Sequence, residues 1–295
     1  MLSFIALYII RKRGEIMKYF VASDIHGFFN EFKAALDEAG YDVNNPNHHL
    51  IICGDIFDRG LQANEVYNFL RSIPKDRRTY IRGNHEYLLK ELTLKYSPQG
   101  HDISNGTLDT LSQLSGIDND FRAAQNSPKV KEILDWIDSD EWVDFLEIDK
   151  YIFVHSFIPL YNHNQALHYY FADPFIDLMY VDDWRKVSDK RMIEGSTWGC
   201  PWKNYLAGLF EAEAQKGKIL VCGHWHANDF YLHLGGKIHE KFECYDIYRG
   251  VNIIALDGCT ARTRKVNVMI INEDFEPYYI KDKEEVKLEI FADSL

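Results

Sequence analysis

The sequence has little that would place the protein in an oxidising compartment or on nucleic acid. Its 295 residues include five cysteines, which lack the paired spacing of a disulfide framework or a thiolate metal site. We therefore expect reduced thiols in a cytoplasmic protein. The formal net charge is −12, and because phosphate backbones recruit basic surfaces, we expect no nucleic acid partner.

Long apolar runs are also missing. Residues 1–10 are apolar, but this stretch is shorter than the roughly 20 residues that cross a bilayer, and its basic residues 11–13 follow rather than precede it. We therefore expect no stable membrane insertion and no secretory signal. Met17 opens a strand-like stretch, so we expect it to be the natural start and residues 1–16 to be a mis-called extension. A short membrane-surface anchor is the alternative for this leader.

The chain shows no internal repeat, low-complexity tract or Gly/Ser linker, so we expect residues 17–295 to form a single domain. Its first ninety residues alternate between two patterns. Apolar runs of strand length occupy 18–23, 49–53 and 79–82, and apolar residues at helical spacing occupy 29–39 and 66–73. This βαβαβ order predicts a parallel sheet with helices on its faces.

The rest of the chain is less regular. Residues 87–150 favour a helical cap insertion, and residues 157–215 are aromatic-rich, with runs at 169–171 and 196–202 that suit a core or a substrate rim. Further strands are expected at 151–154, 218–222, 251–256, 266–271 and 278–280, and residues 284–295 suit a last strand or a tail.

Polar residues gather where the predicted strands end. The stretch 50–60 (LIICGDIFDRG) is the clearest case, because a buried strand delivers glycines, two aspartates and an arginine. Ligands of open α/β sheets bind at that end of the strands. The candidate metal ligands collected in this way are Asp24, His26, Asp55, Asn84, His155, His224 and His226.

These ligand types indicate the kind of metal site. Nitrogen and oxygen donors suit Mn²⁺, Fe or Zn²⁺ better than a soft sulfur site does. Seven ligands exceed the need of one tetrahedral ion, and they fit two divalent ions about 3.5–4 Å apart that share a carboxylate. Asp55 is our candidate for the shared ligand, and Mn²⁺ is our leading metal.

The motifs resemble those of the calcineurin-like metallophosphoesterases. The resemblance rests on residues 24–27 (DIHG), 54–60 (GDIFDRG), 82–86 (RGNHE), His155 and 223–224 (GH). The DRG and NHE forms resemble the phosphoprotein-phosphatase branch, which includes bacterial serine/threonine phosphatases and diadenosine tetraphosphate hydrolases. The resemblance implies a two-sheet α/β sandwich flanked by helices (αββα), with the helical cap as an insertion.

The resemblance also implies roles. Asp24 and His26 would hold the first metal, Asp55 would bridge, and Asn84, His155 and His224 would hold the second. A hydroxide between the ions would attack phosphorus in line. Catalytic and phosphate-binding residues are implied as well: His85 as the acid, oriented by Asp58, and Arg59 and Arg82 on phosphate, with Arg185 or Arg191 as a further candidate. A salt bridge between Arg82 and Glu86 is the structural alternative for that pair.

Two features depart from the phosphatase branch. His155 is followed by Ser156 and Phe157, where that branch usually has glycines. His226 adds the second histidine of a His-x-His pair, which fits either a further ligand of the first metal or a residue that supports a ligand.

The sequence therefore predicts a dinuclear-metal phosphoester hydrolase. A phosphomonoesterase acting on phosphoprotein or on small phosphate esters, nucleotides included, is the leading interpretation. Hydrolysis of dinucleoside polyphosphates is the near alternative. A catalytically inactive scaffold or binding protein on the same fold is the alternative from another class, and the intact ligand set argues against it.

Overall fold

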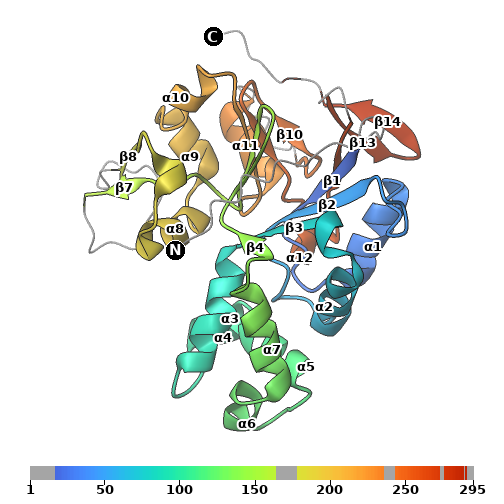
Figure 1. The fold of residues 1–295 in the computed structure, drawn as a ribbon, viewed down its shortest axis with the longest axis vertical. Coiled ribbons are helices and arrows are strands. Elements are labelled where there is room, and N and C mark those ends of the chain that lie inside the picture. The colour runs from blue at the N-terminus through green and yellow to red at the C-terminus, as the bar shows by residue number, and fades with distance from the viewer. Residues whose placement is uncertain (1–16, 164–177, 236–242, 273–275, 289, 291–295) are drawn as a thin grey trace.

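The computed structural model describes residues 17–163, 178–235, 243–272, 276–288 and 290 (Figure 1). The expectations for residues 1–16 and for the aromatic run 169–171 lie outside the described residues.

The first sheet is built on three parallel strands. β1 (Lys18–Ala22) pairs with β2 (His48–Cys53), and β2 pairs with β3 (Arg78–Ile81). Helices α1 (Phe29–Glu38) and α2 (Ala63–Ser72) connect them, which confirms the predicted βαβαβ order. The sheet runs β14 (Glu284–Lys287), β13 (Pro277–Lys281), β12 (Met269–Ile271), β1, β2, β3 and β4 (Trp142–Val143).

The second sheet is made of shorter strands. β9 (Ile219–Cys222) lies at its centre, parallel to both β6 (Tyr151–Phe153) and β11 (Ile253–Ala255). β10 (Tyr248–Arg249) and β5 (Leu146–Ile148) form its edges. A separate hairpin pairs β7 (Tyr161–Asn162) with β8 (Leu178–Met179).

Alternation along the strands makes the two sheets a sandwich. Tyr19 and Val21 pack into a cluster shared with Tyr151 and Val221 of the second sheet, whereas Phe20 faces the helices on the other side. Successive side chains of a strand point to opposite faces, so a central strand with two apolar faces needs a layer on each. The expected α/β sandwich flanked by helices is confirmed.

Helices cover both outer faces. Those packed on the first sheet are α1, α2, α3 (Asn84–Leu94), α5 (Thr107–Ser115) and α7 (Pro128–Ile137). Those on the side of the second sheet are α9 (Pro201–Leu206), α10 (Glu211–Ala214) and α11 (Ala227–Leu234). Short helices α4 (Gly100–Ser104), α6 (Phe121–Gln125), α8 (Lys190–Thr197) and α12 (Thr260–Thr263) complete the layers.

The segment 87–150 differs from a purely helical cap. It contains β4, which extends the first sheet, and β5, which edges the second. These strands have two and three residues, too few to show an alternating pattern in the sequence. Similarly, the strand expected at 266–271 is confined to β12 (Met269–Ile271).

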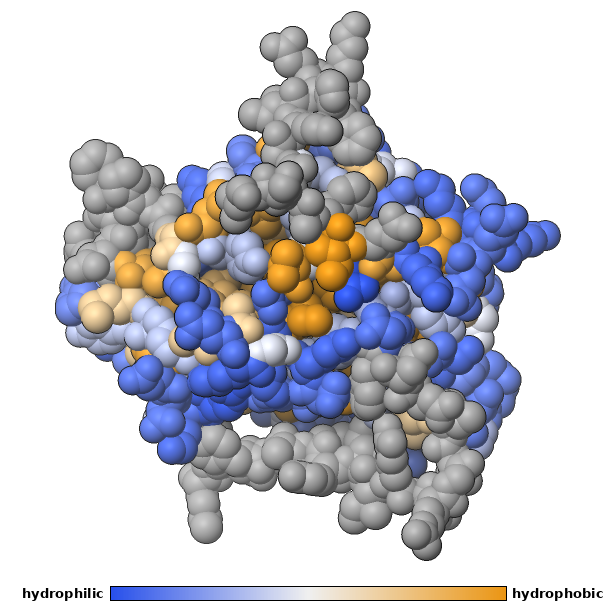
Figure 2. All heavy atoms as spheres, turned by 90° about the horizontal axis from the view of Figure 1, so that it is seen from above, coloured by the Kyte–Doolittle hydropathy of each residue, from blue (hydrophilic) through white to orange (hydrophobic). Residues whose placement is uncertain are grey.

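The helices and the surface were compared with the expectation of no stable membrane insertion. Within the described residues, no helix has the length and apolar character needed to span a membrane. Figure 2 shows a face on which hydrophobic residues gather near the centre, bordered by hydrophilic ones. The five cysteines are free thiols.

Candidate metal centre

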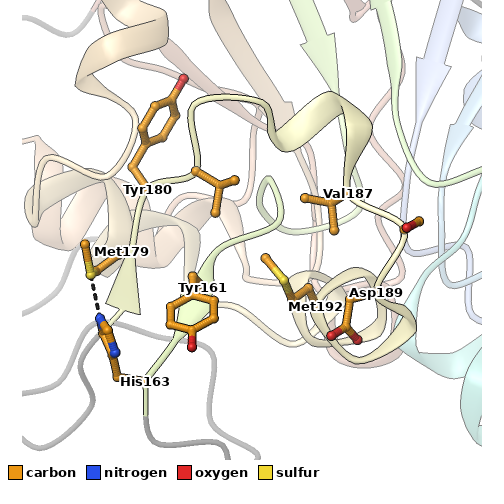
Figure 3. Close-up of a pocket in the computed structure, with 9 residues that line it drawn as sticks. Tyr161, His163, Met179, Tyr180, Val187, Asp189 and Met192 are labelled. Atoms are coloured by element: carbon orange, nitrogen blue, oxygen red, sulfur yellow. Dashed lines mark hydrogen bonds between the residues drawn. The ribbon is translucent and has the colours of Figure 1, made fainter.

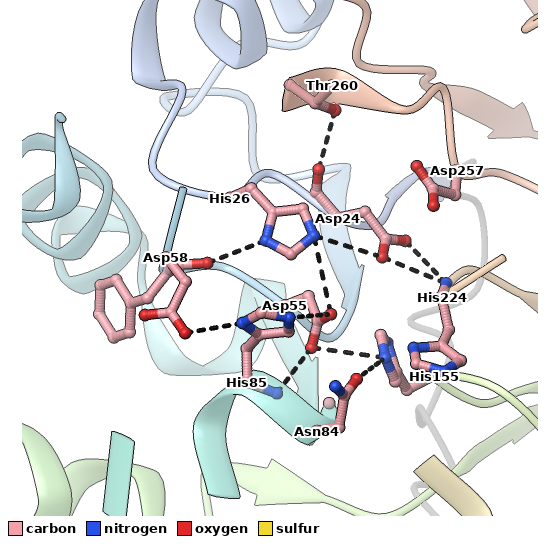
Figure 4. Close-up of polar contacts among 12 residues, drawn as sticks. Asp24, His26, Asp55, Asp58, Asn84, His85, His155, His224, Asp257 and Thr260 are labelled. Atoms are coloured by element: carbon pink, nitrogen blue, oxygen red, sulfur yellow. Dashed lines mark hydrogen bonds and ion pairs between the residues drawn. The ribbon is translucent and has the colours of Figure 1, made fainter. Parts of the chain in front are cut away.

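The expected metal ligands come from loops that follow five strands of the two sheets (Figure 4). Asp24 and His26 follow β1, Asp55 follows β2, His155 follows β6 and His224 follows β9. Asn84 follows β3 as the first residue of α3. The sandwich thus brings together residues that lie up to 200 positions apart in the sequence. For example, His224 donates its backbone N–H to the Asp24 carboxylate at 3.1 Å.

Two groups of ligand atoms share Asp55. One contains His26, Asp55 and His85, and the other contains Asp55, His155 and His224, with the ligand atoms of each group within 4.8 Å of one another. His26 Nε2 lies 3.8 Å from Asp55 Oδ2, and His155 Nε2 lies 3.4 Å from Asp55 Oδ1. The two oxygens of this carboxylate therefore face different groups, as a shared ligand requires.

Hydrogen bonds orient the imidazoles for metal binding. His26 Nδ1 donates to the Phe57 carbonyl at 3.0 Å, and His155 Nδ1 donates to the Cys53 carbonyl at 2.8 Å. Since a carbonyl only accepts, the neutral ring keeps its lone pair on Nε2, which faces the cluster. At His155 this nitrogen lies 2.9 Å from Asn84 Oδ1, so lone pairs converge where a cation would stabilise them.

Burial sets the charge state of these groups. It lowers the pKa of His26 well below its usual value, and burial together with His155 lowers the pKa of His224 to about 3. Burial raises the pKa of Asp55, but His155, His85 and His26 outweigh it and hold that pKa below its usual range. The lowered pKa values of His26 and His224 favour neutral rings, and the lowered pKa of Asp55 favours its ionised form. These are the forms that bind a metal ion, so the residues present fit divalent ions.

Asp24 lies close to two other carboxylates of the site, and their negative charges disfavour its ionised form. Burial, Asp257 and Asp55 raise its pKa well above the usual value, because two further carboxylates lie close to this buried side chain. Its backbone carbonyl accepts a hydrogen bond from Thr260 Oγ1 at 2.9 Å. A bound cation would offset the repulsion among these carboxylates.

The backbone at the site is held in an unusual conformation. Asp24, His26, Asp55 and His224 have φ values between 50° and 65°, a left-handed region that side chains with a Cβ rarely adopt. Such residues concentrate at functional sites because the surrounding structure must hold them there. Gly83 also packs against the site, since a Cβ there would overlap Asp55 Oδ1.

His85 and Asp58 form a buried pair. His85 Nδ1 donates to Asp58 Oδ2 at 2.7 Å. Burial lowers the pKa of His85, but Asp55 and Asp58 outweigh it and the pKa is raised overall. Thr107 Oγ1 also donates to Asp58 Oδ2 at 2.6 Å, and Thr110 Oγ1 accepts the Asp58 N–H. These threonines belong to α5, and no sequence pattern marked them because they lie about fifty residues from Asp58.

Glu86 and Arg82 have different partners from those expected. Glu86 accepts the backbone N–H groups of Gly83, Asp55 and Ile56, at 2.7 to 3.0 Å, and so fixes the loop that carries Asp55. Arg82 pairs with Asp144 at 3.0 Å and donates to backbone carbonyls near the end of α7. The alternative of an Arg82–Glu86 salt bridge is therefore wrong, and these contacts of Arg82 speak against its expected role on phosphate.

The three other arginines considered for phosphate binding are Arg59, Arg185 and Arg191, and they differ in their partners. Arg59 is exposed beside buried Asp58 and makes no ion pair with a described residue. Its charge reaches His26, His85 and His224. Arg185 instead pairs with both Glu147 and Glu213. Its guanidinium is therefore engaged within the protein and is not free to bind a substrate. Arg191 is highly exposed and pairs with Asp189 at 3.6 Å.

His226 lies at the margin of the centre. It precedes α11, its ring is partly exposed, and its nitrogens lie 3.7 Å from Asp229 and 3.9 Å from Asp257. A hydrogen bond with the Cys259 thiol raises the pKa of His226 to about 9, with Asp257 adding to the effect. The structure does not include His226 in either of the two described ligand groups.

A separate pocket lies away from these ligands (Figure 3). It has a volume of about 640 Å³, and Tyr161, Met179 and Met192 are among its lining residues. None of the candidate metal ligands lines it.

Comparison with known proteins identifies the family. The chain matches the model of the calcineurin-like phosphoesterases over residues 17–248 and belongs to that family. Membership implies divalent metal ions, for which the ligand groups above are the candidates.

Similar sequences and structures carry phosphatase names. A symmetrical bis(5'-nucleosyl)-tetraphosphatase of Buchnera aphidicola is 29% identical over 47% of this chain and 43% of its own. The asymmetrical bis(5'-nucleosyl)-tetraphosphatase PrpE of Bacillus subtilis is 37% identical over 23% of this chain and 31% of its own. The chain thus matches less than half the length of these curated relatives.

Solved structures support the fold. A cold-active protein-tyrosine phosphatase of a psychrophilic Shewanella has a TM-score of 0.55 at 16% identity, covering 92% of this chain and 80% of its own. A metallophosphoesterase from Sphaerobacter thermophilus has a TM-score of 0.50 at 13% identity, covering 93% and 89%.

Proposed function

We propose that the protein is a metal-dependent phosphoester hydrolase. The observation that carries this proposal is the pair of buried ligand groups that share Asp55, beside the His85–Asp58 pair. Divalent ions held there would activate water and neutralise charge developing on the phosphoryl oxygens. Two ions fit the ligand set, with Mn²⁺ as the leading candidate and Fe or Zn²⁺ as alternatives.

The ligands divide between the two positions. Asp24 and His26 would serve the first ion, and Asp55 would serve both. Asn84, His155 and His224 would serve the second, with His155 Nε2 and Asn84 Oδ1 already 2.9 Å apart. His226 either ligates the first ion or supports that position through Asp257.

The chain's own residues would handle the leaving group. Asp58 accepts the Nδ1–H of His85 and so keeps the ring oriented with its other nitrogen, Nε2, 3.8 Å from Asp55 Oδ2. A proton held on Nε2 is available to the leaving oxygen, which makes His85 the general acid. Arg59 is exposed and would grip a phosphate with its planar fork.

Two substrate classes remain to be separated. A phosphomonoester, on a serine/threonine phosphoprotein or a small molecule, suits a site with one acid and one exposed arginine. A dinucleoside polyphosphate is favoured by the names of the relatives, which are bis(5'-nucleosyl)-tetraphosphatases. We therefore infer a nucleotide-type phosphoester as the substrate to test first, in a cytoplasmic setting.

The test is a substrate panel. Purified protein is supplied in turn with Mn²⁺, Fe²⁺, Co²⁺ or Zn²⁺ and given diadenosine tetraphosphate, a phosphoserine peptide and p-nitrophenyl phosphate, and the products are identified. We expect hydrolysis that Asp55→Asn abolishes. Absence of hydrolysis with every metal and substrate would contradict the proposal and favour an inactive scaffold.

A further inference from the structure

One tryptophan borders the metal centre without being buried in the core. The ring of Trp198 stands 6.1 Å from that of His224, at an interplanar angle of 85°. Trp198 is partly exposed, whereas Trp184 of the same insertion is fully buried. An aromatic side chain that keeps accessible surface beside the partly exposed ligand His224 has a face to offer to a substrate.

The position of Trp198 is fixed from several sides. It follows α8, which packs against α3, the helix that carries His85. Ser156 Oγ donates to the Gly199 carbonyl at 2.8 Å, and the Phe157 N–H donates to the Ser196 carbonyl at 3.1 Å. The residues on either side of Trp198 are thus hydrogen-bonded to the loop that follows His155, so little conformational freedom would be lost on binding.

One of these hydrogen bonds depends on a departure noted in the sequence. Ser156 and Phe157 stand where glycines are usual in the phosphatase branch, and the Ser156 hydroxyl makes a contact that glycine could not, whereas the Phe157 contact comes from its backbone N–H. In this chain the loop after His155 therefore serves to seat an aromatic residue next to the second ligand group.

We propose that Trp198 stacks on the nucleobase of a nucleotide whose phosphate occupies the metal centre. The proposal rests on the proposed function, which it deepens by naming the specificity residue. An indole face attracts a planar base through stacking and apolar contact, whereas it gains nothing from an inorganic phosphate. Trp198 would then separate nucleotides from other phosphate esters.

The pocket around Tyr161 is the competing location for a base. It is lined by Tyr161, Tyr180, His163 and two methionines. The pocket is lined by neither His155 nor His224, nor by the hydrogen-bond and ring partners described above for these two histidines. Trp198 lies next to His224, so one nucleotide can place its phosphate at the metal centre and its base on the indole. We therefore use a substitution in the pocket as the control.

The experiment compares two probes on the metal-loaded full-length protein. Titration calorimetry measures the dissociation constants of AMP and of inorganic phosphate for the wild type, Trp198→Ala, Trp198→Phe and Tyr161→Ala. We expect Trp198→Ala to weaken AMP binding about tenfold, within the range for loss of one aromatic–base stack, and to leave phosphate binding unchanged. Trp198→Phe should restore most of the loss, and Tyr161→Ala should match the wild type.

Each other outcome has a definite meaning. An equal loss for AMP and phosphate in Trp198→Ala would overturn the proposal, since Trp198 would then only support His224. A loss confined to Tyr161→Ala would place the base in the pocket and also overturn it. Wild-type protein that prefers AMP through Trp198 yet hydrolyses nothing would uphold the stacking role while the proposed hydrolase function failed.

Discussion

The two halves of the sandwich present their ligands by different means. In the first, β1 and β2 have five and six residues and are joined through the ten-residue helix α1. In the second, β6 and β9 have three and four residues, and a long insertion separates them. Asp24 and Asp55 thus follow longer strands joined by a regular helix, whereas His155 and His224 follow short buried strands joined by a less regular segment.

One arginine of the second half links two of its elements by ion pairs. Arg185 binds Glu147 of β5 and Glu213 of α10, at 2.7 and 2.8 Å. Tyr180 donates to Glu213 as well, at 2.7 Å. These contacts link β5, α10 and the segment before α8, in addition to the apolar packing of β6 and β9. Ligand placement in this half should therefore be the more sensitive to changes in charge.

The largest effect is expected where the two halves meet. Asp55 belongs to the first half but faces ligands of both, so Asp55→Ala should release the ions of both positions. Asn84→Ala should mainly weaken the second. The activity lost in Asp55→Ala should exceed the roughly 10–100-fold that is typical of residues supporting a ligand. Elemental analysis after gel filtration gives the metal content, and full retention by Asp55→Ala would show that the halves bind metal independently.

The next largest effect concerns His85 and Asp58, two residues of the first half whose substitution should slow catalysis without removing metal. His85→Ala should slow alkyl phosphates by about 10²–10⁴-fold, the usual value of general acid catalysis. p-Nitrophenyl phosphate should be affected far less, because nitrophenolate leaves without a proton. Asp58→Asn should show the same dependence in milder form, with metal content unchanged.

Steady-state rates on a series of leaving groups measure this dependence. Thr107→Val is an informative companion, because it removes the second hydrogen bond to Asp58 Oδ2 and leaves His85 in place. A uniform loss on every substrate in both His85→Ala and Asp58→Asn would make His85 a positioning residue and refute its role as the acid.

His226 tests whether the second half also serves the first ion. His226→Ala should raise the metal concentration needed for half-maximal activity, by roughly 10–100-fold if the ring supports the site through Asp257. A matched Asp229→Asn variant removes the other carboxylate near this ring and should leave metal affinity unchanged. Equal metal requirements in wild type and His226→Ala would make His226 a bystander.

The same contrast explains what the sequence could predict. Strands β1, β2 and β3 and helices α1 and α2 are long enough for their periodicity to be read, and the polar residues at their ends then follow from sheet topology. The convergence of Asp24, Asp55 and Asn84 was predictable for this reason, whereas His155 follows the three-residue strand β6.

Other features had no local pattern to reveal them. Thr107 reaches Asp58 across 49 residues of sequence, and β4 has two residues, so only the folded chain brings either into view. Arg82 was expected on phosphate and pairs with Asp144 in the structure, because a charge next to a motif looks the same in sequence whichever partner it meets. Side-chain partners of charged residues are set by tertiary packing, which a single sequence does not encode locally.

The smallest expected effect compares one glutamate from each half. Burial raises the pKa of Glu213, but hydrogen bonds from Arg185 and Tyr180 outweigh it and lower the pKa to about 2. In the same way Lys75 and Arg78 lower the pKa of Glu141, which lies in the first half, to about 2. A carboxylate with a lowered folded-state pKa contributes stability above its unfolded pKa, near 4.5, and loses that contribution as the pH falls toward 2.

Glu213→Gln and Glu141→Gln should each flatten the decline in unfolding free energy between pH 5 and pH 3, measured by urea titration. At neutral pH the two variants should differ in which helices show faster amide hydrogen exchange. Glu213→Gln should speed amide hydrogen exchange in α8, α9 and α10, because these short helices open locally once the arginine network is weakened. Glu141→Gln should spare them, since its partners Arg71 and Arg78 anchor α2 and β3 within the larger core. Identical exchange patterns in the two variants would show that both halves rely on charge to the same extent.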